Sequence, residues 1–121
     1  MKHTFSVLIV EESSEVGSSF KRSLSRLGCQ VHMVAYGKDA IHQCEGSTYD
    51  IALISLSIRD IGARTAIRGI RMVCPHTKLF IVTSWYGSLN DNILCLDGVD
   101  GVLHKPARFS EIRRILFDHL G

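Results

Sequence analysis

Polar side chains whose types could bind a cation or a phosphoryl group stand directly after short apolar runs of the sequence. Carboxylates are usual protein ligands of Mg²⁺, and a lysine binds phosphate as a point charge. A serine or threonine hydroxyl is a hydrogen-bond partner or, beside a suitable base, a nucleophile. The residues are Glu11 and Glu12 after residues 7–10, Ser55 after 51–54, Thr83 and Ser84 after 79–82, and Lys105 after 101–104. This repeated placement indicates one shared site, provided that the apolar runs lie side by side.

Apolar runs without polar alternation are typical of strands that are buried on both faces of a parallel sheet. Five such runs lie at residues 7–10, 31–35, 51–54, 79–82 and 101–104. Segments with helical periodicity follow them. They are a helix with Ser13 or Ser14 as its cap and Gly28 as its stop, and helices at 39–44, from 63 to before Pro75, at 90–96 and at 110–120. The order is therefore strand then helix, five times.

This order predicts an α/β fold of the doubly wound (βα)₅ type, with a five-stranded parallel sheet flanked by five helices. The flavodoxin-like strand order 2-1-3-4-5 is favoured among the topologies that fit the count. In such a sheet, ligands bind beyond the carboxyl ends of the strands, where the strand order reverses. The polar residues are therefore expected to meet at that edge, within a single domain spanning residues 1–121.

The composition argues against several classes of protein. The chain has 121 residues, a formal net charge of +2 and 45% hydrophobic residues, which are ordinary values for a globular domain. Domains that bind nucleic acid directly are usually more basic. No apolar run approaches the roughly 20 residues that span a bilayer, so we expect a cytoplasmic protein without membrane contact. The cysteines at 29, 44, 74 and 95 match no zinc-site spacing and are expected to be free thiols.

Four short motifs, in this order, resemble the receiver domain of two-component response regulators, over nearly the whole chain. They are Val7-Leu8-Ile9-Val10-Glu11-Glu12, the segment 49–54 before Ser55, the pair Thr83-Ser84, and Lys105-Pro106. The resemblance implies that an aspartate accepts a phosphoryl group, that an acidic pair holds a divalent metal, and that the lysine contacts the phosphate. It also implies a switch hydroxyl at Thr83 and a peptide bond before Pro106 that is often cis. The alternative for Thr83 is a β-branched residue that only ends a strand.

The sequence departs from the family pattern at the acceptor, because the resemblance places Ser55 where the family has an aspartate. A serine has no carboxylate that could form an acyl phosphate. Two carboxylates and Lys105 also leave a pocket one unit less negative than a family pocket, which has a third carboxylate. We therefore expect no cofactor and weak or absent Mg²⁺ binding, with Glu12 as a poor metal ligand. Glu11 and Glu12 equally suit the acidic first turn of a helix.

A second hypothesis concerns the space left by the change from aspartate to serine. Either Glu11 or Glu12 is expected to fill it and to pair with Lys105, and with Ser55 as a further partner. Such a built-in ion pair would hold the domain in one state.

The predicted function is that of a receiver-like domain in bacterial two-component or phosphorelay signalling. It is expected to act by protein–protein interaction, independently of phosphorylation, and not as an enzyme. The expected surface consists of the fourth helix, the fifth strand and the fifth helix, and would bind a protein partner or a second copy. A sensor kinase or an output domain is a further candidate partner. Trp85, Tyr86 and Val102 are the candidate interface residues.

Two other functions fit the same pattern. A receiver-like domain could respond to a ligand other than phosphate in the vacated pocket. A small flavodoxin-like cofactor-binding protein is the weaker alternative, because no glycine-rich phosphate loop follows residues 7–10. Arg64, Arg68 and Arg71 recur at helical spacing and are expected on a solvated helix face rather than in a binding patch.

Overall fold

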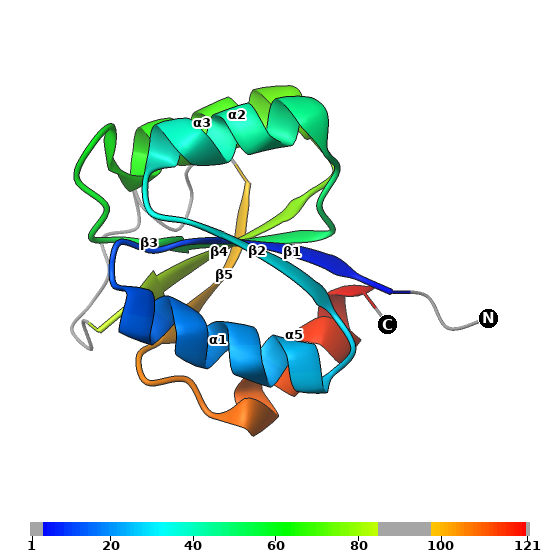
Figure 1. Cartoon of the computed structure of the whole chain (residues 1–121). Helices are drawn as coiled ribbons and strands as arrows, with labels where there is room; N and C mark the ends of the chain where they lie inside the picture. Colours follow the sequence, from blue (N-terminus) through cyan, green and yellow to red (C-terminus); the bar gives the residue numbers. More distant parts are fainter. Residues whose placement is uncertain (1–3, 85–97, 121) are drawn as a thin grey trace.

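The computed structural model describes residues 4–84 and 98–120, and it contains one parallel sheet covered by helices (Figure 1). The strands are β1 (Ser6–Val10), β2 (Gln30–Val34), β3 (Ile51–Ser55), β4 (Lys78–Thr83) and β5 (Val99–His104). The helices are α1 (Ser14–Arg26), α2 (Gly37–Gly46), α3 (Gly62–Val73) and α5 (Phe109–Leu120). All neighbouring strands pair in parallel, in the order β2-β1-β3-β4-β5. The predicted fold and strand order are confirmed, while the helix predicted at 90–96 lies outside the described residues.

Two hydrophobic cores lie on opposite faces of the sheet, which explains the apolar runs of the central strands β1, β3 and β4. The prediction of burial on both faces is wrong for β2 and β5, because they are edge strands and are only partly buried. Figure 1 shows α2 and α3 on one face and α1 and α5 on the other. Within β1, Leu8 and Val10 pack into the α2–α3 core, whereas Val7 and Ile9 pack into the α1–α5 core. Because successive side chains of a strand point to opposite faces, a strand covered on both sides needs apolar residues at every position.

The first helix begins and ends at signals that are local in the sequence. The Ser13 side chain accepts a hydrogen bond from the Val16 N–H at 3.3 Å, so Ser13, and not Ser14, is the cap. Gly28 follows the helix with a φ of 85°, a left-handed conformation that suits a residue without Cβ.

The second helix is longer than predicted, because a distant side chain supports its first turn. The Asp60 carboxylate accepts hydrogen bonds from the N–H groups of Gly37 and Lys38, at 2.9 and 3.0 Å. Desolvation opposes ionisation of Asp60, but these backbone donors outweigh it and hold the pKa of Asp60 below its ordinary value. The prediction of residues 39–44 was too short because Asp60 lies beyond β3 and gives no local signal near Gly37.

The arginines of α3 differ in their exposure and contacts, and the prediction of a solvated face is wrong for Arg71. Its guanidinium donates to the carbonyls of Pro75, Thr77 and Gly98, at 2.7, 2.8 and 2.9 Å, and lies 3.8 Å from the Asp100 carboxylate. Arg71 therefore ties the end of α3 to the start of β5. Arg64 and Arg68 are exposed, as predicted.

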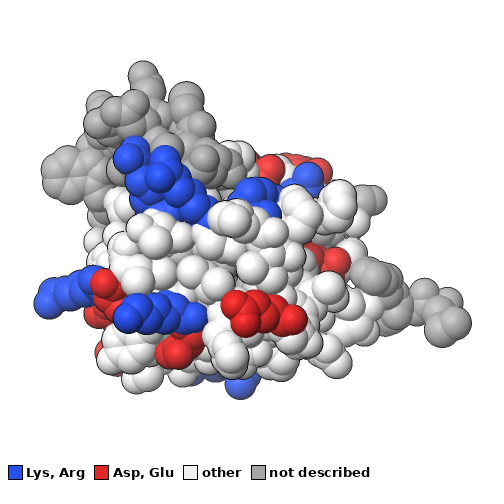
Figure 2. Space-filling view, turned by 90° about the horizontal axis from the view of Figure 1, so that it is seen from above, with Lys and Arg blue, Asp and Glu red and all other residues white. Residues whose placement is uncertain are grey.

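The face over α2 and α3 carries both signs of charge. Figure 2 shows basic side chains along one edge of this face, next to the residues drawn in grey, and acidic side chains mixed with basic ones toward the other edge. Uniformly basic faces are the usual mark of direct nucleic-acid binding, and this face does not have that form.

The three cysteines in the described ranges are buried free thiols, as predicted. The Cys74 thiol lies 3.4 Å from the carbonyl of Cys44, where the end of α3 meets α2. Burial, with the neighbouring Cys74 thiol, raises the pKa of the Cys44 thiol to about 12. The described helices include none with the length and apolar character that a membrane crossing requires.

Candidate functional site

Four of the six polar residues singled out in the sequence lie together at the carboxyl edge of the sheet. Ser55 and Thr83 are the last residues of β3 and β4, while Glu11 and Lys105 directly follow β1 and β5. The register places Ser55 opposite Val82 and continues β1 beside β3, so these strand ends are adjacent. The prediction that one edge collects these residues is therefore correct.

Lys105 is the centre of this site. Its ammonium group donates a hydrogen bond to Glu11 Oε1 at 2.5 Å and another to Ser55 Oγ at 3.1 Å. The side chains of Lys105 and Glu11 are only 17% and 6% exposed, so solvent screens the pair weakly. One ammonium group thus joins the ends of β1, β3 and β5, and its charge is balanced by a carboxylate from the protein itself.

The structure decides between the two acidic residues that were open partners for Lys105. Glu11 forms the ion pair, and its second oxygen, Oε2, accepts a hydrogen bond from the Ser13 N–H at 3.1 Å. Glu12 is exposed and points elsewhere, since its Oε1 accepts a hydrogen bond from the Arg59 N–H at 2.7 Å. Both carboxylates therefore have protein donors, and they do not converge on one point.

Ser55 is 1% exposed and sits in a small network of hydroxyl groups. Its Oγ lies 2.9 Å from Ser57 Oγ and accepts from the Lys105 ammonium. A lysine paired with a carboxylate donates a proton to a hydrogen bond and does not withdraw one from a serine, so the arrangement is unlike an activated nucleophile. Among the described residues, no group of three or more His, Cys, Asp or Glu side chains could hold a metal ion.

The candidate switch and interface residues fall into different surroundings. Thr83 is buried, and its carbonyl accepts a hydrogen bond from the Lys105 N–H at 2.8 Å. Ser84 is exposed, and Val102 is half-buried against the α2–α3 core. Trp85 and Tyr86 lie outside the described residues, so the structure does not test them as interface residues.

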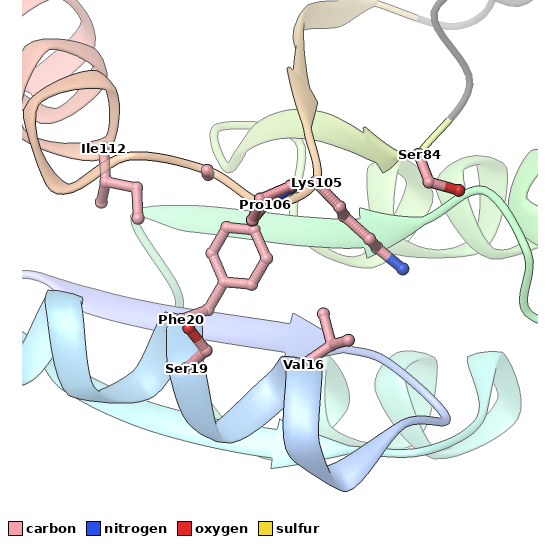
Figure 3. Close-up of a pocket in the computed structure, with 8 residues that line it drawn as sticks. Val16, Ser19, Phe20, Ser84, Lys105, Pro106 and Ile112 are labelled. Atoms are coloured by element: carbon pink, nitrogen blue, oxygen red, sulfur yellow. The ribbon is translucent and has the colours of Figure 1, made fainter.

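The Lys105–Pro106 peptide bond is cis, in agreement with the resemblance. Next to it lies a cavity of about 500 Å³ between α1 and the connection from β5 to α5 (Figure 3). No local pattern in the sequence indicates this cavity, because Val16 and Phe20 belong to an apolar stripe that predicts only a helix packed on the core. Ser57, Arg59 and Asp60 were also missed, since their roles depend on contacts between loops.

A parallel sheet in this order, with an acidic residue, a hydroxyl and a Lys-cis-Pro pair at its carboxyl edge, defines the class of CheY-like receiver domains. The response regulator receiver domain family matches residues 7–117, so the chain belongs to that family.

Known proteins agree with this assignment. The chain is 29% identical over 119 residues to the transcription factor SKN7 of Candida albicans and 27% identical over 107 residues to the transcriptional regulatory protein TcrA of Mycobacterium tuberculosis. These matches cover 96% and 88% of this chain, but only 21% and 42% of the relatives' own lengths. This chain therefore corresponds to one part of those longer proteins.

Solved structures give the same result. A receiver domain from Methylobacillus flagellatus has a TM-score of 0.86 and 27% identity, with coverage of 96% of this chain and 98% of that one. The receiver domain of the sensor histidine kinase PA1611 from Pseudomonas aeruginosa has a TM-score of 0.84 and 26% identity, with coverage of 97% and 98%. That second structure carries a magnesium ion in its active-site cleft.

Proposed function

We propose that this receiver domain does not accept a phosphoryl group and acts through protein–protein contact, independently of phosphorylation. The observation that carries the proposal is the contact of Lys105 with both Glu11 and Ser55. In the family pattern, the residue at the end of the third strand is the acceptor aspartate, and the resemblance places Ser55 there. In this chain the charge of Lys105 is already balanced by Glu11.

The chemistry of the residues supports this proposal. An acyl phosphate needs a carboxylate, and Ser55 offers a hydroxyl whose partners are an ammonium group and the Ser57 hydroxyl. Mg²⁺ needs several oxygen ligands in octahedral geometry and gives up its water reluctantly. Glu11 would have to leave Lys105 and Glu12 would have to leave the Arg59 N–H to bind it. We therefore propose weak or absent Mg²⁺ binding, and a role that is not enzymatic.

The proposed partner is a protein. Receiver domains interact with kinases or output domains, and the similar proteins include a transcription factor and a hybrid signal transduction histidine kinase of Dictyostelium discoideum. The proposed surface combines the helix predicted at 90–96, which lies outside the described residues, with β5 and α5, and its occupant is such a partner or a second copy of the chain. A cytoplasmic location and the absence of direct nucleic-acid contact belong to the same proposal, and the mixed charge in Figure 2 supports the latter.

The test combines Mg²⁺, acetyl phosphate and intact-mass measurement. The wild-type chain should gain no phosphoryl mass, and millimolar Mg²⁺ should leave the amide resonances of Glu12 and Ser57 unchanged. The matched variant is Ser55→Asp, which restores a carboxylate next to Lys105 and should gain both Mg²⁺-dependent amide shifts and a phosphoryl mass. A wild-type chain that acquires the mass, or that binds Mg²⁺ with clear saturation, would contradict the proposal.

A further inference from the structure

The cavity beside Lys105 is lined by Lys105 itself, by α1, by the β5–α5 connection and by α5. Its apolar walls come from Val16 and Phe20 on α1, from Pro106 after β5 and from Ile112 on α5. Figure 3 shows the Phe20 ring pointing from α1 toward Pro106. The volume of about 500 Å³ is in the range of small-molecule sites, and the place, beyond the carboxyl ends of the strands, is where α/β sheets bind ligands.

Two hydroxyl groups add polarity to this apolar space. Ser19 lies on the exposed side of α1, and Ser84 is exposed just after β4. Both are small, so they leave room for a ligand while offering a hydrogen-bond partner to it. A mainly apolar cavity with few polar groups favours a ligand that is itself mainly apolar and carries one hydrogen-bonding group.

The charged side chain that lines the cavity determines which ligand charge the cavity favours. Lys105 is the charged side chain among its described lining residues, and it is held by Glu11. Figure 3 shows the Lys105 amine on the side of Ser84 and Val16, away from the Phe20 ring. An anionic ligand would have to lose water against apolar walls and would meet a lysine that is already neutralised, so an anion is disfavoured.

We propose that the cavity between α1 and the β5–α5 connection binds a small, uncharged, mainly apolar molecule with one hydrogen-bonding group. The apolar part of the ligand packs against the wall that includes Val16, Phe20 and Ile112, and the polar group bonds a hydroxyl of Ser19 or Ser84. The preference for an uncharged ligand rests on the closed Glu11–Lys105 pair that the proposed function also uses. Ligand binding would give the domain an input that needs no phosphoryl transfer.

The test uses indole as the uncharged probe and indole-3-carboxylate as its anionic counterpart. Methyl resonances of Val16, Ala107 and Ile112 are followed by NMR while each compound is added to the wild-type chain. Ser19→Phe places a ring in the cavity from α1. Ser25→Phe is the matched control, because Ser25 is exposed on the same helix and does not line the cavity. Circular dichroism of both variants verifies that they fold.

The expected result is saturable shifts of these methyl resonances with indole, at a dissociation constant of about 1 mM or below. Ser19→Phe should weaken indole binding about tenfold or more, whereas Ser25→Phe should leave it unchanged. Shifts that do not saturate, equal binding in the two variants, or tighter binding of the anion would overturn the inference. A wild-type chain that binds indole in this way and is also phosphorylated would refute the proposed function alone.

Discussion

Replacement of Lys105 by methionine tests the central contact of the site. The change keeps most of the side-chain volume but removes the ammonium group that bonds Glu11 and Ser55. Glu11 then remains as a carboxylate with a 6% exposed side chain, supported by the Ser13 N–H alone among its described hydrogen bonds. Loss of one partner of a buried ion pair costs about 3–5 kcal/mol. Since Lys105 is 17% exposed, we expect the lower end, about 3 kcal/mol.

Urea denaturation at pH 7 measures this loss for Lys105→Met, Glu11→Gln and the double variant. The double variant should lose about 1–2 kcal/mol less than the sum of the single variants, because the two side chains act as a pair. Lys38→Met is the control: Lys38 is exposed, and the removal of its charge should change the free energy of unfolding by less than about 0.5 kcal/mol. A loss below about 1 kcal/mol for Lys105→Met, or strictly additive effects, would refute the reasoning.

Three other contacts give further predictions for the free energy of unfolding. Asp60→Ala should lower it by about 1 kcal/mol at pH 7. The difference in free energy of unfolding between the wild type and Asp60→Ala should become smaller below pH 3.8. The pKa of Asp60 is lower in the folded chain than its ordinary value of 3.8, so the stability that its carboxylate adds is present above pH 3.8 and is lost as the pH falls. The contribution of Cys44 to stability has the opposite pH dependence. Because the pKa of its thiol is raised from 9.0 to about 12 in the folded chain, the thiol loses its proton at a lower pH in the unfolded chain. Between about pH 10 and 11, wild-type stability should therefore fall by about 1.2 kcal/mol per pH unit more steeply than that of Cys44→Ala, and parallel curves would contradict this. Arg71→Met, which removes the donor to three carbonyls, should cost about 2 kcal/mol in urea denaturation, and an unchanged midpoint would show that these bonds add nothing.

Much of the fold follows from local patterns in the sequence. The run at 7–10 predicts a buried strand because all four residues are apolar, and β1 does pack on both faces. Ser13 and Gly28 mark the ends of α1 through short-range hydrogen bonding and backbone conformation, which depend on neighbouring residues alone. The length of α2 could not be predicted in the same way, because its support comes from Asp60, across β3.

The candidate site likewise has features that local patterns predict and features that depend on long-range contacts. Local apolar patterns are enough to place Glu11, Ser55, Thr83 and Lys105 at strand ends, and the topology of a parallel sheet then brings those ends to one edge. The pairing of Lys105 with Glu11 rather than Glu12, and the cavity beside that pair, depend on how the loops and helices pack in three dimensions. The physical reason is range: strand and helix patterns are set by neighbours a few residues apart, whereas the choice of ion-pair partner and the space between side chains depend on the packing of segments far apart in the chain.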